Sequence, residues 1–111
     1  MAPRWQRTVR WGTLSPACGT NAFPHDDSYF YERKLLIDGV PTPYYRLSAL
    51  PSLASMAGLP ATVFPSGRFA ASGAPVGLQV TGAYLEDSST LRFARLVEEE
   101  FGGFVPPPGF D

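Results

Sequence analysis

The 111-residue chain has little of several residue types on which protein chemistry often depends. Its single cysteine, Cys18, allows no internal disulfide, so we expect a reducing compartment, the cytoplasm. It has one histidine, His25, and one lysine, Lys34, so no second histidine is present to complete a zinc site. No apolar run approaches the roughly 20 residues that a membrane-spanning helix needs. The net charge of −1 gives no reason to expect nucleic acid or an anionic membrane as a partner.

The residues that are abundant indicate one small α/β domain with many turns. Glycine and proline number 11 and 12, and the hydrophobic share of 44% is high enough for a modest core. The start is basic, with Arg4, Arg7 and Arg10 and no acid before Asp26. A short transit signal is one interpretation of this basic start. A solvated basic stretch is the preferred one, because no amphipathic stripe is present.

Short apolar runs bounded by glycine and proline predict the secondary structure. We expect strands over 9–14, 34–37, 61–65 and 76–82, and helices over 45–57 and 88–101. The last helix is expected to begin at an N-cap among residues 87–89 and to bury one apolar face, formed by Leu91, Ala94, Val97 and Phe101 with Phe93 at its edge. Asp38-Gly39 indicates a tight turn after the second strand, whereas Pro41 and Pro43 are expected to break the chain. Pro51 either kinks the first helix or starts it, and Gly58 is expected to end it. The two strands between the helices are expected to be antiparallel neighbours, and Gly77 indicates that another chain segment passes close by.

One long string of motifs carries a family resemblance. It comprises Gly58-Leu59-Pro60-Ala61, Pro65-Ser66-Gly67 and Pro75-Val76-Gly77-Leu78-Gln79 … Gly82. Further matching pieces are Leu14-Ser15-Pro16, Phe23-Pro24-His25-Asp26, Ile37-Asp38-Gly39, Leu85-Glu86-Asp87 and Gly102-Gly103-Phe104. Together these motifs resemble the C-terminal part of the amidase signature family over residues 14–111, whereas residues 1–13 match nothing in it.

The resemblance implies a fold and an activity. The fold is α/β, a partial mixed sheet with covering helices and a C-terminal fragment of the amidase signature fold. The family hydrolyses carboxylic amide C–N bonds with two serines and a lysine, through an acyl-enzyme. The segments Phe23-Pro24-His25-Asp26 and Asp38-Gly39 … Tyr44 favour the general small-amide amidases over the tRNA-dependent amidotransferase subunits.

The family's catalytic residues lie upstream of the matched region, and no residue of this chain takes their place. No glycine- and serine-rich stretch is present, and the segment around Lys34 does not resemble that of the catalytic lysine. We therefore expect no catalytic, cofactor or metal site in this chain, which would be a C-terminal fragment, inactive alone and marginally stable. It would associate with itself or with a complementary N-terminal amidase chain. The alternatives are a non-catalytic binding or assembly module and one chain of a split amidase.

Individual residues that suggest chemistry each have a simpler structural interpretation. Lys34 is interpreted as a surface lysine rather than a base. The His25-Asp26-Asp27 run is interpreted as a hydrogen-bonded loop rather than a metal site or proton relay. Ser66 and Ser72 lie outside any nucleophile elbow and are expected to be turn residues.

Three further features are interpreted in the same way. Cys18 is expected to be a small, partly buried thiol. Gln79, inside an apolar strand, is expected to brace neighbouring loops. An aromatic-rich region either shapes an amide pocket in a complete enzyme or simply packs; its members are Phe23, Tyr29, Phe30, Tyr31, Tyr44 and Tyr45.

Overall fold

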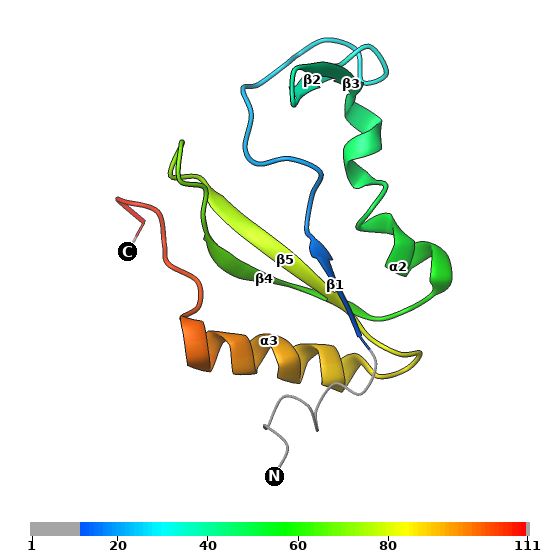
Figure 1. The fold of residues 1–111 in the computed structure, drawn as a ribbon, viewed down its shortest axis with the longest axis vertical. Coiled ribbons are helices and arrows are strands. Elements are labelled where there is room, and N and C mark those ends of the chain that lie inside the picture. The colour runs from blue at the N-terminus through cyan, green and yellow to red at the C-terminus, as the bar shows by residue number, and fades with distance from the viewer. Residues whose placement is uncertain (1–11, 111) are drawn as a thin grey trace.

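A three-stranded antiparallel sheet with one long helix against it forms the centre of the molecule (Figure 1). The computed structural model describes residues 12–110. Its elements are, in chain order, β1 (Thr13–Pro16), β2 (Lys34–Ile37), β3 (Val40–Pro43), the 3-10 helix η1 (Tyr44–Ser48), α2 (Ser52–Ala57), β4 (Ala61–Arg68), β5 (Pro75–Thr81) and α3 (Asp87–Phe101). This arrangement confirms a small α/β body.

The sheet has the order β1-β5-β4, and both of its pairings are antiparallel. The predicted antiparallel pairing of the strands before and after residue 70 is therefore confirmed. The prediction of a mixed sheet is wrong for residues 12–110, because every strand pair there is antiparallel. The first strand was expected over 9–14; residues 9–11 lie outside the described range, and β1 begins at Thr13.

Strands β2 and β3 form a separate hairpin, which Figure 1 shows above the three-stranded sheet. Asp38 and Gly39 join them, with φ of 51° and 79°, which are the values of the type I′ turn that suits hairpins. The expectation that Pro41 and Pro43 break the chain is wrong, since both lie within β3. In a two-residue hairpin these positions fall at non-hydrogen-bonded pairs, so a proline there removes no ladder hydrogen bond.

The helix expected over 45–57 is interrupted in the structure. A 3-10 turn, η1, ends at Ser48, and α2 begins after Pro51, which occupies its N-cap position. Pro51 therefore starts a helix rather than kinking one, because the proline ring blocks an incoming helical turn but fits a helix start. Gly58 ends α2 in the left-handed conformation with φ of 66°, as predicted for the C-terminal stop.

Helix α3 covers one face of the sheet, and its buried stripe differs from the predicted one. Thr90 is buried, and Phe93 and Val97 are half-buried, whereas Leu91 and Phe101 are 61% and 83% exposed. The helix spans Asp87–Phe101, close to the expected range of 88–101. Its N-cap is Glu86, without a side-chain cap, rather than one of the residues 87–89. The predicted face is therefore confirmed for Phe93, Ala94 and Val97, which are half-buried, and wrong for Leu91 and Phe101.

The core of the described region is very small. Four apolar side chains among residues 12–110 are buried, namely Leu47, Ala54, Phe64 and Val80. Phe64 of β4 meets Phe93 of α3 edge to face, with 5.8 Å between ring centroids. The hydroxyl of Thr62 donates to that of buried Thr90 at 2.9 Å, which ties the same two elements together. Such a core leaves most large apolar side chains of these residues in contact with solvent.

Candidate functional site

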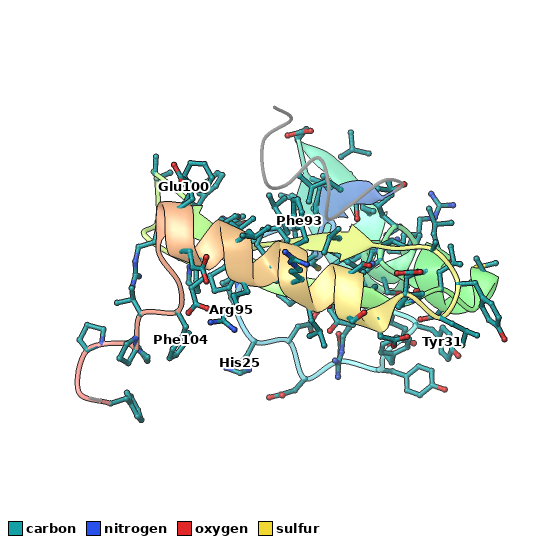
Figure 2. All side chains as sticks on the ribbon, turned by 90° about the horizontal axis from the view of Figure 1, so that it is seen from below. His25, Tyr31, Phe93, Arg95, Glu100 and Phe104 are labelled. Atoms are coloured by element: carbon teal, nitrogen blue, oxygen red, sulfur yellow. The ribbon has the colours of Figure 1, made fainter. Side chains whose placement is uncertain are left out.

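Six aromatic side chains gather around the β2–β3 hairpin, as the sequence suggested. They form a chain of ring contacts with centroid distances between 5.1 and 6.3 Å. Tyr44 is central, because Phe23 and Phe30 both meet it edge to face. In Figure 2 Tyr31, a member of this cluster, lies at the opposite end of the view from Glu100 of α3. The members are Phe23, Tyr29, Phe30, Tyr31, Tyr44 and Tyr45.

A pocket of about 210 Å³, called here the hairpin pocket, opens beside this aromatic cluster. Its polar lining comes from His25 and Asp26 of the preceding loop and from Arg33 and Lys34 at the start of the hairpin. Its apolar lining consists of Phe23, Pro24, Leu35 and Tyr44. The structure therefore brings the loop histidine and aspartate next to the chain's one lysine, a proximity that their spacing in the sequence did not suggest.

Arg33 organises the hairpin pocket, although no sequence motif singled it out. Its Nε donates to the backbone carbonyl of Ser28 at 2.7 Å, and its guanidinium carbon lies 5.8 Å from the centre of the Tyr44 ring. The two contacts fix the guanidinium between the loop and the hairpin. Local sequence does not predict them, because an arginine before a strand is ordinarily a solvated side chain.

Asp26 closes a tight turn at the edge of the pocket. Its carboxylate accepts hydrogen bonds from the hydroxyl and from the backbone N–H of Ser28, the second at 2.9 Å. These two hydrogen bonds, together with the positive charge of Arg33, hold the pKa of the Asp26 carboxyl below its ordinary value. The loop interpretation of the His25-Asp26-Asp27 run is thus confirmed for Asp26.

This turn predicts a measurable pH dependence. A carboxyl whose pKa is lowered on folding stabilises the turn above its ordinary pKa of 3.8, and this contribution is lost as the pH falls through the lower, folded-state value. We expect the amide proton of Ser28 to shift in an NMR titration with a midpoint below pH 3.8. Asp26→Asn should abolish that inflection. A midpoint at or above 3.8 in the parent chain would contradict the role of these hydrogen bonds.

The two serines with a nucleophile-like setting have structural roles. Ser66 lies at the β-bulge between Pro65 and Gly67, where its hydroxyl donates to the carbonyl of Val76 at 3.1 Å. The hydroxyl of Ser72 accepts from the backbone N–H of Ala74 at 3.3 Å, within the β4–β5 turn. Neither serine lines the hairpin pocket that contains Lys34. The structure therefore does not bring Ser66 or Ser72 together with Lys34 in this pocket.

The remaining candidates are placed as follows. Cys18 is an exposed free thiol, so the expectation of a partly buried one is wrong. Gln79 is buried, and its side-chain amide donates to the carbonyl of Pro51 at 3.2 Å. That hydrogen bond joins the sheet to the start of α2, which confirms the bracing role. Gly77 lies between neighbouring strands, with Ala17 and Val63 at van der Waals distance from where a Cβ would stand.

A second hollow, which no sequence motif indicated, lies between the sheet, α3 and the segment after it. This apolar groove measures about 540 Å³, and its walls include Leu14 and Phe64 of the sheet and Phe93 of α3. Phe101 and Phe104 line its other end and are 83% and 74% exposed. Figure 2 shows Phe104 in the segment that follows α3. None of the residues among 12–110 that line the groove is charged, so it suits an apolar protein surface better than catalysis.

Two classes of feature are missing from the described part of the chain. Residues 12–110 contain no group of three or more histidine, cysteine or acidic side chains placed to hold a metal ion. Among the same residues, no helix is long and apolar enough to cross a membrane.

Similarity to known proteins is limited to part of much longer chains. No protein-family model matches the chain. It is 34% identical over 95 residues to the subunit designated A of glutamyl-tRNA(Gln) amidotransferase from Hyphomonas neptunium, which covers 86% of this chain and 17% of that protein. With the corresponding protein of Anaeromyxobacter sp. strain K the identity is 37% over 70 residues, or 63% and 14% of the two chains. With that of Prochlorococcus marinus it is 35% over 85 residues, or 77% and 16%.

The chain thus spans about one sixth of the length of these relatives. The matched stretch is C-terminal, and the relatives are amidase-signature proteins. These findings support the resemblance at the level of a short C-terminal stretch. The relatives belong to amidotransferases, so the preference for general small-amide amidases receives no support from them.

Proposed function

We propose that residues 14–111 form the C-terminal part of an amidase-signature enzyme that hydrolyses carboxylic amide C–N bonds. In this proposal the chain supplies packing surface, and a complementary N-terminal amidase body supplies the two serines and the lysine. The observation that carries the proposal is the apolar groove, an uncharged hollow of about 540 Å³ with exposed phenylalanines at its rim. Exposed apolar side chains gathered around one hollow form a surface that a protein partner can cover.

Two further observations support this assignment. The 34% identity to the Hyphomonas neptunium protein extends over 86% of the chain. The described residues hold four buried apolar side chains, which is a small core for a body of this size. A surface contributed by a larger enzyme would bury the exposed phenylalanines and raise the stability of the chain.

The chain alone is expected to hydrolyse no amide, because it has no counterpart of the family's glycine- and serine-rich stretch and the segment around Lys34 does not resemble that of the catalytic lysine. The full test is complementation. The Hyphomonas neptunium protein, with the 95-residue matching stretch deleted, would be co-expressed with this chain. Ammonia release from a panel of small carboxamides would then be measured. We expect activity from the pair and none from either part.

The matched control is the same deleted protein co-expressed with its own 95-residue stretch. Activity in that control but none with this chain, at equal amounts of co-purified complex, would contradict the proposed function. Hydrolysis by the purified chain alone would also contradict it. Formation of an inactive but stable complex would favour the alternative of a non-catalytic assembly module.

A further inference from the structure

The hairpin pocket has the chemistry of a binding site for a small anion, independently of the proposed amidase function. Among residues 12–110 its lining carries the cations Arg33 and Lys34 and one acid, Asp26. The Asp26 carboxylate is already engaged by the N–H and the hydroxyl of Ser28. Counting these three groups, the pocket carries an excess of one positive charge, which favours an anionic occupant.

The guanidinium of Arg33 is already oriented before an anion binds. Its Nε is fixed on the carbonyl of Ser28 at 2.7 Å, and the Tyr44 ring lies 5.8 Å from its central carbon. A guanidinium has five N–H donors, and the hydrogen bond to Ser28 uses one of them. An arginine whose orientation is already set loses less entropy when it binds a carboxylate through two parallel hydrogen bonds.

The size and the apolar lining of the pocket restrict the anion further. A volume of about 210 Å³ is below the range of about 300–1,000 Å³ that is usual for drug-sized ligands, so one ring or a short aliphatic chain fits. Phe23, Leu35 and Tyr44 offer apolar surface to the body of the ligand. An inorganic phosphate would leave that surface uncovered, whereas a carboxylate with an apolar body would use both halves of the pocket.

From these features we infer that the hairpin pocket binds a small monocarboxylate with an apolar body, of about the size of benzoate. In this site Arg33 is the main partner of the carboxylate, Lys34 adds positive charge at the pocket, and Phe23 and Tyr44 offer apolar surface to the ring. Neither the resemblance nor the relatives assign a ligand to these residues.

The test is an NMR titration of the 111-residue chain with benzoate, benzamide and inorganic phosphate. Benzoate should give saturable shifts at residues 23–35 and 44, with a dissociation constant on the order of 1 mM, as suits a ligand of this size. Benzamide has the same shape without the charge, and phosphate has the charge without the ring, so both should bind about tenfold more weakly. Equal binding of benzamide would overturn the role of the charge, and equal binding of phosphate would overturn the role of the apolar lining. Absence of saturable benzoate shifts at these residues would overturn the inference as a whole.

Variants locate the effect at this pocket. Arg33→Gln should weaken benzoate about tenfold, the loss expected for a charge-assisted hydrogen bond. Arg46→Gln, which removes the same charge from an exposed residue of η1 outside the pocket lining, is the matched control and should leave the affinity unchanged. If Arg33→Gln disturbs the loop, the benzoate affinity of Lys34→Gln is measured instead, because Lys34 occupies an exposed strand position. Equal affinity in Lys34→Gln and Arg46→Gln would then overturn the inference.

Discussion

Replacement of Phe64 by alanine is expected to abolish the packed structure of the sheet and α3. Phe64 is 6% exposed and is the only aromatic side chain that is buried among residues 12–110. Its ring meets Phe93 at 5.8 Å, and Leu78 lies opposite it on β5. Truncation of a buried phenylalanine costs about 3–5 kcal/mol, a large part of the roughly 5–15 kcal/mol that stabilises a typical domain. Residues 12–110 hold three other buried apolar side chains, Leu47, Ala54 and Val80, so little other packing can offset this loss.

Near-UV circular dichroism and urea unfolding of the 111-residue chain would measure this effect. We expect Phe64→Ala to lose the near-UV signal of packed aromatic rings and any cooperative transition. Phe101→Ala makes the same chemical change at an 83% exposed position and should alter the free energy of unfolding by less than about 0.5 kcal/mol. Equal unfolding curves for the two variants would show that Phe64 and Phe93 do not form the centre of the core.

Local sequence signals predicted the elements that depend on local chemistry. The turn at Asp38-Gly39, the stop at Gly58 and the long last helix follow from backbone preferences, and the structure has all three. The antiparallel pairing of β4 and β5 also follows, since a short connection favours it. Pro51 shows the limit of such signals. A proline is compatible with either a kink or a helix start, and the separate 3-10 turn before it decides between the two.

The sequence-based predictions were wrong where contacts between distant segments determine the structure. Leu91 and Phe101 are among the most apolar positions of the last helix, yet Thr90 faces the sheet because its hydroxyl is paired with Thr62. The sequence predicted prolines 41 and 43 as breaks, whereas the register of the hairpin places both at positions that need no donor. Neither the hydrogen bond between the two threonines nor the strand register can be read from one segment alone.

The candidate site was predictable only as a collection of residue types. The aromatic region was identified from composition, and its rings do meet. The hairpin pocket was not predicted. It depends on the contacts of Arg33 with the carbonyl of Ser28 and with the ring of Tyr44, and no sequence motif indicates these contacts. The sequence suggests no catalytic serine–lysine pair, and the structure places neither Ser66 nor Ser72 in the pocket that contains Lys34.

Alanine at Gly82 gives the second large expected effect, because its methyl group has no space. Gly82 is buried just after β5, and a Cβ there would lie 2.7 Å from Cγ2 of Thr90. Thr90 cannot easily turn away, since its hydroxyl donates to the carbonyl of Asp87 and accepts from Thr62, both at 2.9 Å. Overpacking of this kind costs about 1–3 kcal/mol, which urea unfolding of the full chain would detect.

Two comparisons make this prediction specific to the contact between Gly82 and Thr90. Gly103→Ala also meets a neighbour, but that neighbour is the flexible side chain of exposed Glu98, so the free energy of unfolding should change by less than about 0.5 kcal/mol. Thr90→Ser removes the Cγ2 methyl and keeps the hydroxyl. In the double variant of Gly82→Ala with Thr90→Ser, the cost of the alanine should therefore largely disappear. Full additivity of the two single changes would show that the steric contact is not the cause, whereas rescue would establish that the close approach of β5 and α3 at Gly82 depends on the absence of a side chain.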